Sequence, residues 1–328
     1  MQAHRGVTEY GITELRIGDH YADKIKILLD GGKIYCYGSQ DFKILRETIC
    51  FGGSASVYAA KWKNTSTIYA IKKFVDNKEI DLTNIANSHK NIIQFHGITK
   101  FDDEEKYSLV LEYADGGTLR DYLRNDTITF KWKDQLKFAK EIASAILWLH
   151  DDRGIVHGDL HPNNILMHQN TIKLADFGRS SLKESDCDNN TEVWGVMPYV
   201  DPKAFDQETS YKMNEKSDIY CLGFLFWELT SRKSPFDGLR DCDITLKILS
   251  GVRENPVSNT NGEFIKLYQK CWKYEPDERP NISQVNSELH NIDSNNNNTS
   301  TFLYSKKSEE SKRTHSCQID FNKICQQD

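Results

Sequence analysis

The chain has 328 residues, of which 38% are apolar and 27% charged, and its formal net charge is -6. This is the composition of a globular protein large enough for two cores, and its mild charge gives no reason to expect a nucleic-acid partner. The longest apolar run, residues 219–227, is too short to cross a bilayer, which needs about 20 apolar residues, so membrane insertion is excluded.

The eight cysteines are scattered along the chain, and none forms a C-x-x-C pair. The scattered spacing argues against a zinc site and against a disulfide framework. The N-terminal residues, MQAHRGVTEYG, also lack the apolar core of a signal peptide. Both observations favour reduced thiols in a cytoplasmic protein.

Residues 1–40 carry no clear hydrophobic period, although a short helix is expected near 21–29. Gly31, Gly32 and Gly38 interrupt the segment after that helix. We therefore interpret 1–40 as an N-terminal extension of unassigned role that is partly flexible.

Strands are expected on both sides of a glycine-containing turn, Cys50-Phe51-Gly52-Gly53, with Val57 in the second strand. A third apolar run, residues 68–72, ends in a lysine. Because successive side chains of a strand point to opposite faces, Lys72 turns inward and Lys73 is its exposed neighbour. An ordinary hairpin followed by a surface lysine is the alternative interpretation.

A short helix should follow, because Leu82 and Ile85 recur at helical spacing after Glu79. Residues 107–113, YSLVLEY, have the pattern of a buried strand that leads into a glycine-containing turn. Residues 132–150 form a strong helix, with apolar residues recurring at three and four positions. We assign these apolar positions to the core and give them no chemical role.

The most informative stretch is 157–178, HGDLHPNNILMHQNTIKLADFG. Phosphoryl transfer from ATP needs one carboxylate that accepts the hydroxyl proton of the substrate, and an amide and a second carboxylate that hold Mg²⁺ on the phosphates. Asp159 fits the first role, and Asn164 with Asp176 fits the second. For each residue taken alone, a buried acid, a capping amide or an ordinary turn is the alternative.

The spacing H-x-D-L-x-x-x-N, followed twelve residues later by D-F-G, resembles the catalytic and metal-binding loops of the eukaryotic protein kinases. The resemblance covers about 41–291 and includes C-W-x-x-x-P-x-x-R-P at 271–280, which is characteristic of tyrosine kinases and the tyrosine-kinase-like group. It implies an α+β, two-lobed fold, with a small β-rich N-lobe containing one helix (about 41–114) and a larger helical C-lobe (about 115–291). The Asn- and Ser-rich residues 292–328 are expected to form a disordered tail.

The same resemblance implies that ATP and Mg²⁺ bind between the lobes. Asp159 is expected to be the proton acceptor, and Lys72 to reach the α- and β-phosphates. Asn164 and Asp176 are the expected metal ligands, and His161 can donate a hydrogen bond toward the γ-phosphate. The residues expected to line the nucleotide site are Gly52, Val57, Ala70, Lys72, Leu111, Glu112, Ala114 and Leu166.

The small lobe departs from the family pattern at two points. Cys50 and Ala55 stand where the glycine-rich hairpin usually has its first and third glycines. Glu79, the expected ion-pair partner of Lys72, follows it by only seven positions, so the helix is expected to be shortened at its start. Asp81 is the other candidate partner, and a regulatory protein that completes the ion pair is an open alternative.

The catalytic stretch departs as well, because Gly158 replaces the arginine that normally receives an activation-loop phosphate. The loop after Gly178 contains Ser180, Ser181, Ser185 and Thr191, which are expected to be exposed. Phosphorylation of this loop is therefore not expected to be the main switch.

Lys203 replaces a glutamate that normally pairs with a late arginine, here Arg279. Two cations cannot pair, so either another acid such as Asp201 takes that place or the contact is lost. Asp218 opens the most apolar helix and is expected to accept hydrogen bonds from backbone amides of the catalytic loop. A simple helix cap is the alternative.

These features favour an ATP-dependent kinase that phosphorylates serine and threonine in protein substrates. Those acceptors are expected because the tyrosine-kinase-like group mostly uses them. The alternative is a pseudokinase, a binding or scaffold module that keeps the fold without catalysis. Neither the N-terminal extension nor the tail carries a kinase motif, so both are expected to be dispensable for catalysis.

Overall fold

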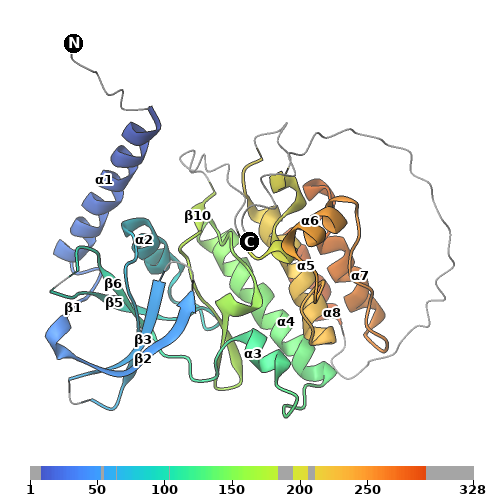
Figure 1. Cartoon of the computed structure of the whole chain (residues 1–328), viewed down its shortest axis with the longest axis horizontal. Helices are drawn as coiled ribbons and strands as arrows, with labels where there is room; N and C mark the ends of the chain where they lie inside the picture. Colours follow the sequence, from blue (N-terminus) through green and yellow to red (C-terminus); the bar gives the residue numbers. More distant parts are fainter. Residues whose placement is uncertain are drawn as a thin grey trace.

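The computed structural model describes residues 9–52, 55–63, 65–102, 104–183, 195–205 and 211–292, with the backbone alone described for 9–19, 46–52 and 55. Within these ranges the chain folds into two lobes, one built around a β-sheet and the other around helices (Figure 1). The expected α+β, two-lobed architecture is confirmed.

The small lobe contains a six-stranded sheet of order β1-β5-β6-β4-β3-β2. Neighbouring strands are antiparallel except β1 and β5, which are parallel. Lys72, the last residue of β4, is in register with Val57 on β3 and Leu109 on β6. The elements of this lobe are α1 (Glu9–Asp30), β1 (Cys36–Gly38), β2 (Phe42–Gly52), β3 (Ala55–Trp62), β4 (Ile68–Lys72), α2 (Asn77–Ala86), β5 (Phe95–Lys100) and β6 (Ser108–Glu112).

The large lobe is mostly helical, with short strands near the site. Its elements are α3 (Leu119–Arg124), α4 (Trp132–Leu147), β7 (Ile155–Val156), β8 (Ile165–His168), β9 (Thr171–Leu174), β10 (Ser181–Leu182), α5 (Glu215–Ser231), α6 (Asp241–Leu249), α7 (Gly262–Cys271) and α8 (Ile282–Asn291). A π-helical turn, Trp148–Asp152, continues α4. Strands β8 and β9 pair with each other, and β7 pairs with β10.

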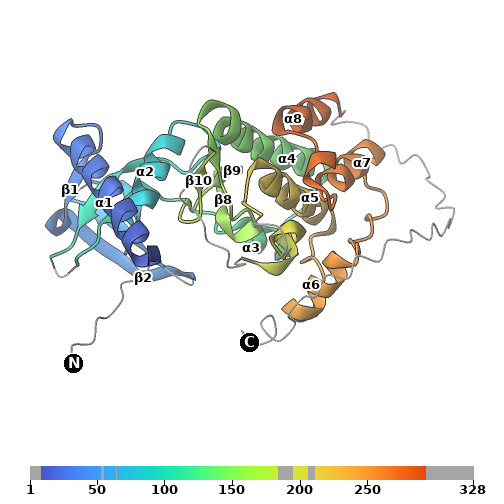
Figure 2. The same cartoon turned by 90° about the horizontal axis from the view of Figure 1, so that it is seen from above.

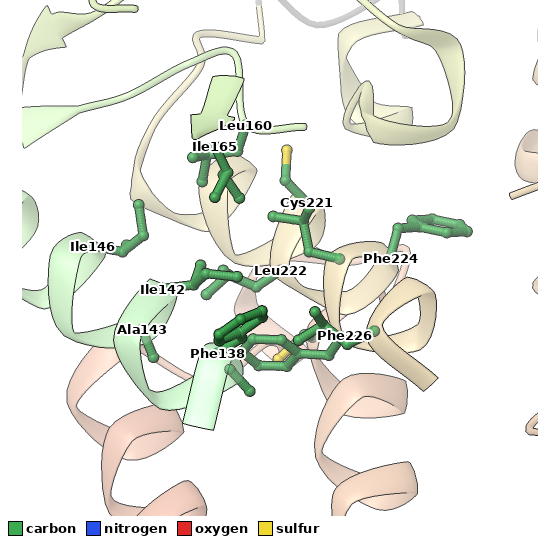
Figure 3. Close-up of a cluster of buried hydrophobic side chains, with 14 of the residues drawn as sticks. Phe138, Ile142, Ala143, Ile146, Leu160, Ile165, Cys221, Leu222, Phe224 and Phe226 are labelled. Carbon is green, nitrogen blue, oxygen red and sulfur yellow. The ribbon is translucent and has the colours of Figure 1, made fainter. Parts of the chain in front are cut away.

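The contact of α4 with α5 forms the centre of the large-lobe core (Figure 3). One face of α4 buries Phe138, Ile142 and Ile146, as its periodicity predicts. Leu222 and Phe226 of α5 lie against these side chains. Most of α5 is buried on every side, so the residues at its start are held in the interior of the lobe.

The N-terminal extension differs from the sequence expectation. Helix α1 has 22 residues, and β1 adds a sixth strand to the sheet. β1 runs along β5, with Cys36 opposite Ile98, and covers the edge of that strand. Residues 20–40 are therefore part of the small lobe, which contains two helices where one was expected, and the boundary at residue 41 falls inside this unit.

The reason for the difference is a short apolar stripe on α1. Ile25, Leu28 and Leu29 recur at helical spacing and pack against the small-lobe core, where Ile25 is only 2% exposed. Gly32, with a φ of 64°, lies just after the helix, where a left-handed residue is a common terminator. β1 has three residues, too few for an alternating pattern to be recognised.

No helix within the described ranges has the length and apolarity that crossing a bilayer requires. The tail expected at 292–328 lies, apart from Ile292, outside the described residues. Ile292 itself is buried in the large-lobe core.

The docking of α1 can be tested with two isoleucines of the same helix. Ile25→Ala should lower the free energy of unfolding by about 2–5 kcal/mol, because it leaves a cavity in the small-lobe core. Ile27→Ala is the control, because Ile27 is 69% exposed and should change little. Urea unfolding midpoints measure both, and equal effects of the two substitutions would contradict the docking of α1.

Candidate active site

Lys72 pairs with two carboxylates, one in its own lobe and one in the large lobe. Its Nζ donates a hydrogen bond to Oε1 of Glu79 on α2 at 2.6 Å. It donates a second to Oδ1 of Asp176, just after β9, at 2.8 Å. Of the two acids considered as partners, Glu79 reaches Lys72, whereas Asp81 pairs with Lys24 on α1.

The short spacing between Lys72 and Glu79 is accommodated by a late start of α2. The helix begins at Asn77, so Glu79 lies in its first turn. The side chain of Asp76 caps the helix by accepting the backbone N–H of Glu79 at 2.7 Å. Thr83 Oγ1 donates to the Glu79 carbonyl at 2.6 Å. The shortened helix therefore still delivers Glu79 to the lysine.

The charges of this group depend on one another. Burial is the largest influence on the pKa of Lys72 and would lower it, but Asp176 and Glu79 outweigh burial and raise the pKa. Burial would raise the pKa of Asp176, but Lys72 outweighs it and the pKa is lowered. At Glu79, burial prevails over the opposing effect of Lys72 and raises the pKa. Lys72 is thus a cation and Asp176 an anion at neutral pH.

Asp159 lies on the loop before β8 and is held by its neighbours in sequence. The Nδ2 of Asn164 donates to the Asp159 carbonyl at 2.9 Å and to its Oδ2 at 3.2 Å. His161 Nε2 lies 3.6 Å from Asp159 Oδ1, and Arg179 Nε lies 3.8 Å from Oδ2. Burial would raise the pKa of Asp159, but His161, His157 and Arg179 outweigh burial and lower it. The carboxylate is therefore ionised and able to accept a proton.

Asp218, at the start of α5, organises this loop as expected. Its carboxylate accepts the backbone N–H groups of His157 at 2.8 Å and Gly158 at 2.9 Å. It also contacts His150 Nε2 at 2.8 Å. Burial would raise the pKa of Asp218, but His150, His157 and the Gly158 amide outweigh it and lower the pKa. A buried anion thus fixes the two backbone amides on either side of His157, just before Asp159.

The segment Asp176-Phe177-Gly178 is joined to the catalytic loop. The Ala175 N–H donates to the Asn164 carbonyl at 2.9 Å, and His157 Nε2 lies 3.2 Å from the Ala175 carbonyl. Phe177 is buried beside the His157 ring. Asp176 adopts a left-handed φ of 68°, and its Oδ1 accepts the Gly178 N–H at 3.2 Å. The two expected metal ligands are therefore positioned by one connected set of hydrogen bonds.

The residues expected around the adenine are also brought together. Ala70, Ala114 and Leu166 pack against the cluster that contains buried Leu111. The Glu112 N–H is bonded to the Gln94 carbonyl at 2.8 Å. The segment that joins the two lobes, from Glu112 to Ala114, thus lies beside β4 and β8, which supply an apolar surface from each lobe.

The glycine-containing turn is described only in part. Gly52 ends β2 opposite Ala55, and Cys50 pairs with Val57. Residues 53 and 54 lie outside the described residues, as do the side chains of Cys50 and Ala55. The contact of this turn with phosphate stays a prediction.

The acid missing from position 203 is replaced by a neighbour. Asp201 forms a buried, bidentate ion pair with Arg279, with distances of 2.5 and 2.9 Å. Lys203 instead pairs with Glu275 at 2.9 Å. Of the two alternatives left open by the sequence, the structure confirms Asp201.

One expectation about the loop after Gly178 is wrong. Ser180 is buried, because its Oγ donates to the His157 carbonyl at 2.9 Å and so supports the catalytic loop. Ser181 is half-buried in β10, and Ser185 and Thr191 lie outside the described residues. Arg179 and His150 also contribute to the site but were not expected there. Their only signals in the sequence are a cation next to the D-F-G triplet and a histidine at the end of a periodic apolar pattern.

A family model for the protein kinase domain matches residues 44–290, which is more than half of the chain. The chain belongs to the protein kinase family. The two-lobed architecture described above is that of a protein kinase domain.

Relatives named as kinases match the same region. One named as a serine/threonine-protein kinase/receptor in Acanthamoeba polyphaga mimivirus is 33% identical over 254 residues, covering 73% of this chain and 15% of the relative. One named as a serine/threonine-protein kinase in Dictyostelium discoideum is 28% identical, and the match covers 71% of this chain and 14% of the relative. Mitogen-activated protein kinase kinase kinase 7 of Drosophila melanogaster is 28% identical, and the match covers 76% of this chain and 37% of that protein. The chain therefore spans less than half the length of these relatives.

The role of Asp218 gives a pH-dependent prediction. At pH 7, Asp218→Asn should lower the free energy of unfolding by about 1.5–3 kcal/mol, the size of a hydrogen bond to a charged group. Because the pKa of Asp218 is lower in the folded state, its stabilisation is complete above about pH 4 and is lost as the pH falls further.

Urea unfolding over a pH series measures this effect. The difference between wild type and Asp218→Asn should be constant from pH 6 to 8 and shrink in acid. Asp126→Asn, at an exposed position, is the matched control. A difference that grows on acidification would show that Asp218 is not a stabilising anion.

Proposed function

We propose that this protein is an ATP-dependent kinase that transfers the γ-phosphate of Mg-ATP to serine and threonine hydroxyls of protein substrates. The observation that carries the proposal is the pairing of Lys72 with both Glu79 and Asp176, beside an ionised Asp159 held by Asn164. Protein kinases require both the lysine–glutamate pair and the metal-binding aspartate in place for transfer.

The side chains at the proposed metal site have the chemistry that Mg²⁺ prefers. This ion takes oxygen ligands, commonly one or two carboxylates together with phosphate oxygens. Asp176 retains 42% exposure of its side chain despite its contact with Lys72. The amide nitrogen of Asn164 faces Asp159, so the amide oxygen is directed away from that carboxylate. Asp176 and Asn164 would hold the metal, which when bound neutralises charge on the phosphates.

The remaining side chains of the site would bind the phosphates, the adenine and the substrate hydroxyl. Lys72 would bind the α- and β-phosphates while Glu79 fixes its position. Asp159 would orient the substrate hydroxyl and accept its proton, because its lowered pKa keeps it ionised. His161, 3.6 Å from Asp159, would donate a hydrogen bond toward the γ-phosphate. Leu111 would close the adenine site.

Serine and threonine specificity is supported by the names of the relatives and by the likeness to the tyrosine-kinase-like group. Two relatives carry the name mitogen-activated protein kinase kinase kinase, so we propose signalling as the setting. Cys36, Cys221, Cys242 and Cys271 are free thiols within the described ranges, which supports a cytoplasmic location. Protein substrates, and the regulatory partner considered above, belong to the same proposal.

A pseudokinase is the second candidate, and Gly158 is the observation that favours it. Gly158 has a φ of 76°, and a Cβ at this position would lie 2.8 Å from the Arg179 carbonyl. This glycine stands where most kinases have the arginine that binds the activation-loop phosphate. Two glycines of the nucleotide turn are also absent. None of these changes removes a group assigned to the reaction itself.

The activity proposal is tested with Asp159→Asn. Loss of a general base should lower the rate of γ-phosphate transfer by about 10²- to 10⁴-fold. Wild type and variant should both melt at higher temperature with Mg-ATP, because a ligand that binds the folded state stabilises it by about 2.7 kcal/mol at one hundred times its Kd. Transfer of radiolabelled phosphate and thermal melting provide the two measurements.

The control and the contrary outcomes separate the two candidates. Asp126→Asn, on an exposed turn, should behave as wild type in both measurements. A Mg-ATP shift without transfer by the wild type would establish the pseudokinase. Absence of both would refute the nucleotide site itself.

Phosphoamino-acid analysis of the autophosphorylated protein tests the acceptor. Phosphoserine and phosphothreonine should dominate, because neither His161 nor Asn163 supplies the arginine that tyrosine kinases use after the catalytic aspartate. Phosphotyrosine as the main product would refute the specificity and leave the kinase assignment standing.

A further inference from the structure

Helix α1 lies directly against α2, the helix that carries Glu79 (Figures 1 and 2). Ile25 is buried in the same core cluster as Ile80 of α2. Beside this apolar contact, the Nζ of Lys24 donates to Oδ2 of Asp81 at 2.5 Å. The contact between the two helices thus combines an apolar seam with one ion pair.

The ion pair is unusual because Asp81 is buried. The Asp81 side chain is 1% exposed, whereas that of Lys24 is 38% exposed. Among the described residues, Lys24 is the only one whose side chain forms a hydrogen bond with the Asp81 carboxylate. The other oxygen of that carboxylate, Asp81 Oδ1, has no hydrogen-bond partner among them. A buried carboxylate without a partner is costly, so the position of Asp81 depends on the cation supplied by α1.

The location of Asp81 connects this pair to the active site. Asp81 follows Glu79 by two positions, so the two side chains leave α2 about 200° apart. α2 is consequently held on one side by Lys24 of α1 and on the other by Lys72 of β4. Because the helix starts at Asn77, no full helical turn precedes Glu79 to hold it in place.

The two ends of α2 are anchored differently. At its C-terminal end, Asn87 exchanges two hydrogen bonds with the backbone of Phe95, at 2.9 and 3.1 Å. At its N-terminal end, the Asp76 cap is local, and the ion pair with Lys24 joins the helix to α1. The half of the helix that bears Glu79 therefore relies on α1.

We propose that Lys24 is a positioning residue that acts through Asp81 to hold Glu79 against Lys72, so that α1 replaces the missing first turns of α2. This inference rests on the function proposed above, because the Lys72–Glu79 pair matters only where a nucleotide binds. It predicts that the N-terminal extension is needed for full activity, against the expectation from the sequence that this extension is dispensable.

The test uses Lys24→Met, which keeps the aliphatic stem and removes the charge. It should raise the KM for ATP and lower kcat/KM by about tenfold, the size of couplings between contacting residues. Lys24→Arg restores the cation and should recover most of this loss. Lys26→Met is the matched control, because Lys26 is an exposed lysine of the same helix.

A purely structural role is distinguished by repeating the substitution beside Glu79→Gln. If Lys24 acts through Glu79, adding Lys24→Met to Glu79→Gln should cost little further kcat/KM. An equal factor in both backgrounds, or no recovery with Lys24→Arg, would overturn the proposal.

A measurement of Mg-ATP binding tests the role of Lys24 without requiring phosphate transfer. If the wild type transfers no phosphate, the kinase proposal fails. The wild type, Lys24→Met, Glu79→Gln and the double variant are then compared by the shift in melting temperature with Mg-ATP. Lys24→Met should reduce that shift in the wild-type background and not beside Glu79→Gln. An equal reduction in both backgrounds, or no reduction in either, would refute the positioning role independently of activity.

Discussion

The arrangement of the two lobes depends on one buried ammonium group. Lys72 belongs to the small lobe, Asp176 to the large lobe, and Glu79 to the helix beside them. Burial alone would favour loss of the proton from Lys72, and the two carboxylates reverse that tendency. Removal of either carboxylate would therefore change the pKa values of the other two groups. The charges of Lys72, Glu79 and Asp176 therefore link α2 to the segment at Asp176, in addition to the packing and hydrogen bonds that hold each of them.

Much of the site could be predicted because its chemistry is local in sequence. Asp159 and Asn164 are five residues apart, and the amide bonds both the backbone and the carboxylate of Asp159. The alternating pattern around Lys72 placed it on the inner face of a strand. Asp201 could be named because Lys203 left Arg279 without its usual acid, and a bidentate ion pair needs a carboxylate close by.

The remaining features arise from contacts between distant parts of the chain, which no local pattern contains. Lys24 and Asp81 are 57 positions apart, and only three apolar residues on α1 indicated that it docks. Ser180 was expected to be exposed because serine usually is, but a carbonyl of the catalytic loop lies within reach of its hydroxyl group. His150 ends a regular helix, and its partner Asp218 lies 68 positions later. Tertiary packing, and not composition, decided each case.

In the proposed mechanism, the attachment of α1 to the outside of the small lobe and binding at the nucleotide site are coupled reciprocally. Binding equilibria are linked, so a nucleotide that favours the paired state of Lys72 and Glu79 must strengthen the attachment of α1 by the same factor that this attachment strengthens nucleotide binding. The outer face of α1 is accessible, with Ile27 69% exposed. A molecule that recognises attached α1 would thereby sense whether the site is occupied without touching the nucleotide.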